Sequence, residues 1–385
     1  METMQPALKN GRNVWDRINM PKEEFDGRIG RVRAGMRERG IDLLLVYSRG
    51  LNNYGDAAYL TNFIIRLPRG TLVALPLAGE PAVFFEGGSR GIPSLQMTMA
   101  AGELKAASLL AKDCGKYLRE KKWVPTTVGL AGLKGQMPFQ QFRNLMGELE
   151  GCSIKEADDL IAGFRAEKSR LEIDEIRRAA RIVGQLVAFL KESGFEGAGE
   201  RTVEALLFRT ARLEGAEDVR LLIAKPGDTN HAFRPLDDAP VFKGERIVFS
   251  LAVEYERYWA EAMRTFLFNG ASFAEEPDNG LAAAYRELCD AAKPGVEIQT
   301  LARKAASLMG EKAMEAIYPY GLGCGIGLGH QEAPLLTEEN QGKLKEGMTL
   351  SLRIASGRGN GFSVMGNTVL VAEGGGIILS VEPVK

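Results

Sequence analysis

Glycine occupies every odd-numbered position from Gly321 to Gly329, and this segment constrains the fold more than any other. If the segment is extended, one face is bare backbone and the other carries Leu322, Cys324, Ile326 and Leu328. A bare face lets another backbone or a ligand approach closely. The spacing is not the Gly-x-Gly-x-x-Gly of a dinucleotide-binding loop, because Ile326 or Leu328 would have to be glycine. Three polar residues, His330-Gln-Glu332, follow directly.

Composition predicts a large globular protein of about two domains, at roughly 150 residues per domain. The chain has 385 residues, of which 45% are hydrophobic and 26% charged, with a formal net charge of −1. This balance excludes an electrostatic site for nucleic acid. Neither a signal peptide nor a run of about 18 apolar residues is present, so we expect a cytoplasmic protein with no membrane contact. The four scattered cysteines predict reduced thiols rather than disulfides.

The first part of the chain alternates between helix and strand patterns. Helical spacing at 25–36 precedes a short apolar run at 42–47, and two further runs at 71–75 and 82–85 flank the turn sequence Ala78-Gly-Glu-Pro81. Later, 128–131 reads as a strand and Pro138 opens a helix. The pattern predicts a small α/β domain over residues 1–162.

A capping box, Ser169-Arg-Leu-Glu172, marks the start of the second domain, which we expect over residues 163–385. Two amphipathic helices follow, over about 173–190 and 202–213. Apolar runs predict paired strands at 246–253 and 258–268 around a tight connection. A helix at about 298–309 and strands at 348–352 and 368–371 complete the expected elements.

Several of these segments resemble, in the same order, the Xaa-Pro aminopeptidase and creatinase family of pita-bread hydrolases. Residues 321–334 resemble its Gly-x-Gly-His-Gly-Ile-Gly-Leu-x-x-His-Glu-x-Pro segment, and residues 244–266 resemble Gly-Asp-x-Val-x-x-Asp…Asp-x-x-Arg-Thr-Phe. Residues 20–63 are similar to the start of its N-terminal domain, and 168–179 to the entry into its catalytic domain. The resemblance implies an α+β fold, with a C-terminal pita-bread domain preceded by a smaller α/β creatinase-type domain.

The resemblance also implies which residues stand at the metal-binding positions. Metallopeptidases of this family hold two divalent cations with Asp, Asp, His, Glu and Glu, and the matching positions here are Ser250, Glu261, Cys324, Arg353 and Gly366. Only Glu261 and Cys324 have ligating side chains. A pair of divalent cations needs several anionic oxygens, whereas Arg353 would add a fifth positive charge. We therefore predict no metal and no other cofactor.

Creatinase, by resemblance, cleaves a C–N bond without metal and uses a histidine as acid and base. Its Thr-Asn-Ala-His-Asn-Pro segment resembles residues 229–235, which contain His231 and one additional residue. His330 is the only other histidine of the chain. An imidazole transfers protons near neutral pH, so His231 or His330 is expected to be the catalytic base. The alternative is that each is a hydrogen-bonding residue of the cleft wall.

The remaining candidate site residues surround these histidines. Glu261 is assigned to catalysis or to positioning the substrate, and contacts with substrate are expected from Ser250, Cys324, Glu332 and Arg353. Arg353 has two interpretations, a bidentate site for a substrate carboxylate or a salt bridge with Glu261. Cys324 likewise is either a nucleophile with a pKa lowered by Arg353 or a small buried filler.

Members of this family with this N-terminal domain are commonly homodimers, so Tyr54 and Arg66 are candidates to reach a partner's cleft or are ordinary loop residues. The function that follows is hydrolysis of a small amide, guanidino or amidino compound, or of a short peptide, without metal. One alternative is a relative that binds a small molecule or peptide without turnover. A second is a metal-dependent Xaa-Pro aminopeptidase.

Overall fold

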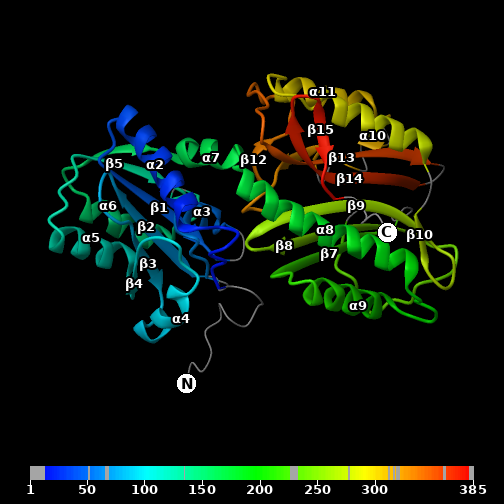
Figure 1. The fold of residues 1–385 in the computed structure, drawn as a ribbon, viewed down its shortest axis with the longest axis horizontal. Helices are drawn as coiled ribbons and strands as arrows, with labels where there is room; N and C mark the ends of the chain where they lie inside the picture. Colours follow the sequence, from blue (N-terminus) through cyan, green and yellow to red (C-terminus); the bar gives the residue numbers. More distant parts are fainter. Residues whose placement is uncertain are drawn as a thin grey trace. The chain divides into compact units, whose positions relative to one another are not determined.

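The structure is a computed structural model that describes residues 14–50, 53–65, 69–133, 135–225, 233–275, 278–310, 313–314, 317, 321–358 and 361–380. The chain forms two compact units, Met1–Arg165 and Ala166–Lys385, and this boundary lies three residues after the expected one at 162. Figure 1 shows the order of helices and strands within each unit. None of the helices in the described ranges is both long and apolar enough to cross a membrane.

The N-terminal unit is built on a six-stranded mixed sheet. Its strands are β1 (Leu43–Arg49), β2 (Gly70–Pro76), β3 (Ala82–Glu86), β4 (Glu103–Ala107), β5 (Thr127–Ala131) and β6 (Ser153–Glu156). Its helical segments are α2 (Lys22–Glu38), α3 (Gly55–Thr61), η1 (Ser89–Gly91), α4 (Ile92–Gln96), α5 (Leu110–Glu120), α6 (Phe139–Glu148) and α7 (Asp158–Ala166). The strand order is β4-β3-β2-β1-β5-β6.

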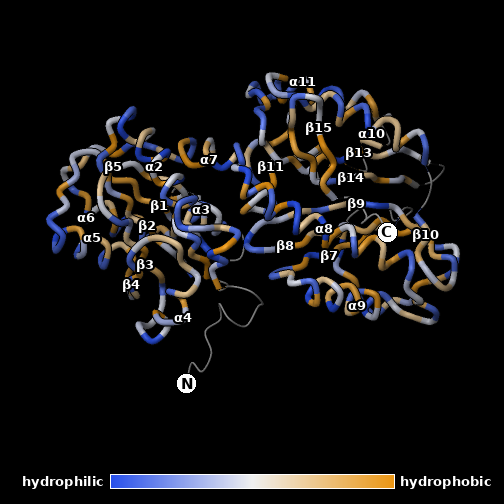
Figure 2. The backbone as a smooth tube through the Cα atoms, viewed as in Figure 1, coloured by the Kyte–Doolittle hydropathy of each residue, from blue (hydrophilic) through white to orange (hydrophobic). Residues whose placement is uncertain are grey.

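Apolar periodicity explains the elements of this unit that the sequence predicted. Phe25, Ile29, Val32 and Met36 recur at helical spacing, and all are buried on one side of α2. Strands β1, β2 and β3 pair antiparallel in sequence, which confirms the expected three-strand start. Helix α6 begins directly after Pro138, also as predicted. Figure 2 shows hydrophobic residues along β1 and β2 and hydrophilic residues on the outer helices α5 and α6.

The C-terminal unit is built on a nine-stranded sheet. Its helices are α8 (Arg170–Glu192), α9 (Glu200–Leu213), α10 (Asn279–Ala291) and α11 (Ile298–Ser307). Its strands are β7 (Asp218–Ala224), β8 (Arg246–Tyr255), β9 (Tyr258–Phe268), β10 (Phe273–Glu275), β11 (Gly323–Gly325), β12 (Glu332–Leu335), β13 (Thr349–Arg358), β14 (Gly361–Ala372) and β15 (Gly375–Ile378). The order is β12-β11-β13-β14-β9-β8-β7, with β10 on β9 and β15 on β14.

Local sequence signals fix the start of this unit and its central hairpin. The predicted capping box is present, because Ser169 Oγ accepts the backbone N–H of Glu172 at 3.2 Å and the Glu172 carboxylate accepts that of Ser169 at 3.0 Å. Strands β8 and β9 are joined by Glu256 and Arg257, both with positive φ, as a two-residue hairpin turn requires. The expected strand pair is therefore confirmed.

The helices of the C-terminal unit cover one face of its sheet. Helices α8 and α9 share a core with Leu251 and Ala262, and α10 and α11 share a core with Leu352. In register, Leu352 pairs with Asn367, and Asn367 pairs with Ala262, so both cores lie on the same side. Alternate residues of each strand point the other way. The opposite face therefore carries Glu261, Ser351 and Arg353.

Candidate functional site

A row of side chains crosses the sheet from β11 to β7 on the face opposite the helices. Strand pairing places the residues of β11, β13 and β14 in this row side by side, and likewise those of β9, β8 and β7. A 2.8 Å hydrogen bond from the Glu261 backbone N–H to Thr368 Oγ1 joins these two groups. We call this set the cross-sheet row. It consists, in order, of Cys324, Ser351, Thr368, Glu261, Ala252 and Arg220.

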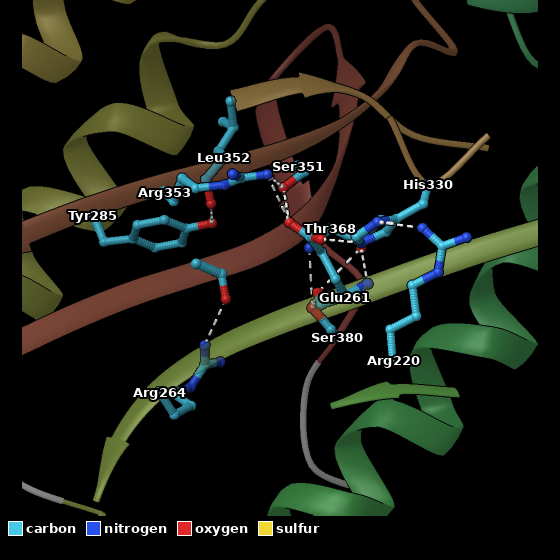
Figure 3. Close-up of polar contacts among 11 residues, drawn as sticks. Arg220, Glu261, Arg264, Tyr285, His330, Ser351, Leu352, Arg353, Thr368 and Ser380 are labelled. Carbon is cyan, nitrogen blue, oxygen red and sulfur yellow. Dashed lines mark hydrogen bonds and ion pairs between the residues drawn. The ribbon is translucent and has the colours of Figure 1, made fainter. Parts of the chain in front are cut away.

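Glu261 is the centre of the cross-sheet row, and both of its carboxylate oxygens are engaged (Figure 3). Oε1 accepts a hydrogen bond from Ser351 Oγ and another, at 3.0 Å, from Arg353 Nη2. Oε2 lies 2.6 Å from His330 Nε2. Arg353 Nη2 also donates to Ser351 Oγ at 3.0 Å, which closes a triangle around Oε1. Neighbouring side chains thus hold both carboxylate oxygens of Glu261 in place.

The network keeps Glu261 ionised although the residue is buried. Burial alone would raise the pKa of this carboxyl, but the charge of Arg353 and the hydrogen bonds from His330 and Ser351 outweigh it and lower the pKa to about 2. The side chains of Arg353 and Glu261 are only 3% and 2% exposed. The structure therefore has the buried salt bridge that was one of the two interpretations of Arg353.

The alternating glycines before His330 allow the backbones of neighbouring strands to pack closely. A Cβ atom at Gly323 or Gly325 would lie well under 3.0 Å from a carbonyl oxygen, of Ser351 in β13 or of Ala333 in β12 respectively. Only glycine allows both neighbouring strands to approach β11 in this way. The close approach predicted from the sequence is confirmed, and it places the turn after β11 over the cross-sheet row.

A second buried ion pair holds that turn. Lys168 Nζ donates to Glu332 Oε1 at 2.6 Å, and the backbone N–H of Gly329 donates to Glu332 Oε2 at 3.2 Å. The two side chains are 2% and 7% exposed. Glu332 was expected to contact substrate, but the structure joins its carboxylate to Lys168 and to the turn that carries His330. We infer that it positions His330.

Arg220 and Trp259 complete the surroundings of His330. Arg220 Nη1 lies 3.5 Å from His330 Nδ1, and the guanidinium carbon of Arg220 lies 4.5 Å from the centre of the Trp259 ring. The rings of Trp259 and His330 are 5.2 Å apart. Because Ala252 separates Arg220 from Glu261 in the sheet, no large side chain lies between them in the cross-sheet row. Figure 3 shows Arg220 reaching toward His330.

Sequence reasoning missed Arg220, Trp259, Ser351, Thr368 and Lys168. A signal existed for Ser351, which precedes Arg353 by two residues and so shares its face of the strand. The same alternation puts Trp259 on the face of Glu261. No motif pointed to Arg220, because its contact with His330 depends on the path of a distant turn.

Three of the positions implied to bind metal bring no charged group to the site. Ser250 is buried in β8, and Gly366 lies opposite Arg353 in β14. Burial raises the pKa of the Cys324 thiol to about 11, although the charge of Arg353 opposes this rise. A raised pKa favours the interpretation of Cys324 as a buried filler over that of a nucleophile, since burial outweighs the nearby cation.

The remaining expected site residues are His231, Arg66 and Tyr54. His231 and Arg66 lie outside the described residues. Tyr54 belongs to the N-terminal unit, where it precedes helix α3 and is 5% exposed. His330 and Glu261 are therefore the two expected catalytic residues that the structure brings into contact.

The described residues do not fit a pair of divalent cations. No group of three or more His, Cys, Asp or Glu side chains within the described ranges is arranged to hold a metal ion. The one carboxylate of the implied ligand set, Glu261, is bound by Arg353 at 3.0 Å. A guanidinium at that distance would repel a cation bound to the same carboxylate. The donor chemistry thus differs from that of the two-metal sites that the resemblance implies.

Two family models match the chain. Residues 174–373 match "Metallopeptidase family M24", and residues 28–166 match "Creatinase/Prolidase N-terminal domain". Among similar proteins, the Xaa-Pro dipeptidase of Pyrococcus horikoshii is 24% identical over 283 residues, which are 72% of this chain and 80% of that protein. An uncharacterized peptidase of Staphylococcus aureus is 27% identical over 278 residues, 64% of this chain and 79% of that protein.

Solved structures share the fold over most of the chain. The X-Pro aminopeptidase from Thermotoga maritima matches with a TM-score of 0.76 and 21% identity, covering 92% of this chain and 98% of that one. The prolidase from Pyrococcus horikoshii matches with a TM-score of 0.73 and 19% identity, covering 93% and 99%. The expected two-domain pita-bread fold is confirmed. The chain belongs to metallopeptidase family M24, a family of hydrolases that act on C–N bonds, and carries a creatinase/prolidase N-terminal domain.

Proposed function

We propose that this chain hydrolyses a C–N bond of a small amide, guanidino or amidino compound without a metal, and that His330 is the general base. The observation that carries the proposal is the 2.6 Å contact between His330 Nε2 and Glu261 Oε2. An ionised carboxylate accepts only, so the Nε2 proton faces Glu261 and the lone pair of the neutral ring lies on Nδ1. Nδ1 lies 3.5 Å from Arg220 Nη1, and it accepts a proton from the attacking water when that water displaces this long contact.

The reaction follows from these positions. His330 Nδ1 removes a proton from water, the water oxygen forms a bond to the carbon of the substrate, and the C–N bond breaks. The same proton passes from Nδ1 to the departing nitrogen, which restores the neutral ring. Glu261 stabilises the imidazolium formed between these steps and holds its orientation, as a carboxylate does behind a catalytic histidine. Ser351 and Arg353 keep Glu261 in place.

The internal cation at Arg353 supports catalysis without metal. Its guanidinium occupies one side of Glu261, and its partner position across the sheet is Gly366 rather than an acid. The names of the similar dipeptidases and aminopeptidases bring Xaa-Pro peptides into the range of substrates to be tested. A metal-dependent aminopeptidase would lose activity in a chelator, whereas the proposed enzyme would keep it.

A binding protein without turnover is the second candidate. It is favoured by the engagement of both Glu261 oxygens in a buried network, which prevents Glu261 itself from exchanging protons with a substrate. A compound that raises the melting temperature but is not consumed would identify this role.

The test is a matched pair of substitutions, His330→Asn and His231→Asn, assayed in EDTA against a compound found by thermal shift. We expect His330→Asn to lower kcat by about 100-fold or more, because general-base catalysis contributes that much. Folding should be retained by circular dichroism. A full loss in His231→Asn with an active His330→Asn would transfer the base role to His231. Two tightly held metals per chain by elemental analysis would refute the metal-independent mechanism.

A further inference from the structure

We propose that Ser380 is a positioning residue for the pair formed by Glu261 and His330, so that the segment after β15 is needed for the geometry of the site. This inference rests on the proposed function, because Glu261 orients the general base only if Glu261 itself is held. It concerns the backbone carbonyl of Glu261, whereas Arg353, Ser351 and His330 hold its carboxylate.

The first argument is that the sheet divides at Glu261. One edge of β14 pairs with β13, and its other edge has two successive partners. This second edge pairs with β9 over residues 365–367 and with β15 over residues 369–372. Thr368 lies between the two stretches and faces Glu261 of β9. We call this point the fork. Regular backbone pairing therefore stops at the residue that orients the general base.

The second argument is that two hydroxyl groups close the fork in place of backbone bonds (Figure 3). Thr368 Oγ1 accepts the backbone N–H of Glu261 at 2.8 Å and lies 3.2 Å from the Glu261 backbone oxygen. Ser380 Oγ donates to the same oxygen at 3.0 Å and accepts the backbone N–H of Thr368 at 3.1 Å. A serine hydroxyl donates and accepts at the same time, so one atom of Ser380 joins β9 to β14.

The third argument is that Ser380 has a fixed, buried position. The residue before it, Leu379, donates its backbone N–H to the Thr368 backbone oxygen at 2.9 Å. Asn367 Oδ1 lies 3.2 Å from Ser380 Oγ and accepts a hydrogen bond from Arg264 at 2.6 Å. Ser380 and Asn367 are 2% and 1% exposed. Because the position is buried, water does not readily replace a hydroxyl lost from Ser380.

The consequence concerns the 2.6 Å contact between Glu261 Oε2 and His330 Nε2. His330 belongs to the turn after β11, so this contact joins two elements and depends on where β9 lies. Without the Ser380 hydroxyl, the backbone oxygen of Glu261 keeps only the longer contact with Thr368, and β9 is free to shift at the fork. A displacement of about 1 Å in a catalytic group can lower the rate by about 100-fold.

The test observes the proton on His330 Nε2, which should exchange slowly with water because it bonds to a buried carboxylate. Nitrogen-15 NMR identifies its signal by comparison with His330→Asn. Wild type is compared with Ser380→Ala, with Ser380→Thr, which keeps a hydroxyl, and with the control Ser363→Ala. Ser363 is a buried serine of β14 whose hydroxyl has no hydrogen-bond partner in the described part of the chain.

We expect this proton to exchange about 3- to 10-fold faster in Ser380→Ala, since one buried hydrogen bond is lost. Ser380→Thr and Ser363→Ala should behave like wild type. Once a hydrolysed compound is known, Ser380→Ala should lower kcat by about 10-fold and leave KM near the wild-type value, because the substrate does not contact Ser380.

The outcomes separate this inference from the proposed function. An exchange rate in Ser380→Ala equal to that of wild type, or one raised equally in Ser363→Ala, overturns the positioning role. Turnover together with either result leaves the hydrolase proposal standing. A rise confined to Ser380→Ala in a protein that hydrolyses none of the compounds supports the positioning role and refutes the hydrolase. If Ser380→Ala fails to fold, Ser380→Cys replaces it in the same comparison, because its thiol is a weak donor.

Discussion

Glu261 and Arg353 form a buried ion pair in which each residue depends on the other. Glu261 is held by Arg353, Ser351 and His330, so its charge is compensated although the residue is buried. Such pairs add little net stability compared with apolar residues of similar size. Removing one partner, however, leaves an isolated charge in the sheet. The pair therefore fixes the orientation of both side chains and adds little to the net stability of the protein.

Glu261→Gln should lower the free energy of unfolding by about 3–5 kcal/mol, because Arg353 would be left buried without its counter-charge. The double variant Glu261→Gln/Arg353→Met should be less destabilised than the sum of the two single variants. Urea unfolding at pH 7 measures all four proteins. Strict additivity would show that the two side chains do not interact energetically.

Lowering the pH should remove the stabilisation that the ionised Glu261 provides. Glu261 has a folded-state pKa of about 2, against about 4.3 for an unfolded glutamate. Because the folded value is lower, the stabilisation is complete above about pH 4.3 and is lost as pH falls toward 2, roughly 3 kcal/mol in all. Urea unfolding from pH 6 to pH 2 should show the stability gap between wild type and Glu261→Gln closing over this window. A gap of constant size would contradict the low pKa.

At the scale of elements, local signals predicted the central hairpin and helices α2, α6, α8, α9 and α11, but not α5 or α10. The capping box at Ser169 and the apolar runs of β8 and β9 depend on neighbouring residues only. Strands β13 and β14 extend well beyond the predicted 348–352 and 368–371, because their outer residues pair with each other, as Gly357 does with Phe362. Such pairing is a tertiary effect that β-propensity does not contain.

Short strands and the rest of the site were missed for related reasons. Strand β6 has four exposed residues and pairs with β5, so its sequence carries no apolar pattern. In the site, the motif resemblance pointed to Glu261 and Arg353, which lie 3.0 Å apart. Arg220 was missed because its neighbour His330 lies 110 residues away in the chain.

Gly325→Ala should destabilise the protein by about 1–3 kcal/mol, because the new methyl group would collide with the Ala333 carbonyl oxygen and force β12 away from β11. The turn that carries His330 joins these strands, so kcat should fall as well. Gly147→Ala in helix α6 is the control, since open space surrounds that position. Thermal unfolding measures both, and equal melting temperatures would contradict the packing argument.

At the scale of the whole molecule, the two units have separate sheets and separate cores. The family models match them one by one, residues 28–166 in the first and 174–373 in the second. The polar network described here is formed entirely by residues of the second unit. The described residues of the first unit contribute no side chain to this network.

The resemblance to homodimeric family members predicts a dimer in solution. Strand β6 forms an edge of the N-terminal sheet, and Val124 and Ile154 near this edge are 90% and 41% exposed. Apolar residues at an open sheet edge favour association. Light scattering after gel filtration should give twice the chain mass of 42.0 kDa. A particle of single-chain mass at micromolar concentration would contradict the prediction.

The packing around Gly366 limits which single substitutions the site accepts. A side chain there would meet the Cβ atoms of Arg353 at 3.2 Å and of Met263 at 3.3 Å. Replacing Arg353 alone by an acid would put two carboxylates together inside the sheet, and adding an acid at 366 alone would crowd the arginine. Each of these two substitutions alone therefore introduces a like-charge pair or a steric clash. Arg353 and Gly366 can be exchanged for acidic residues only if both change together.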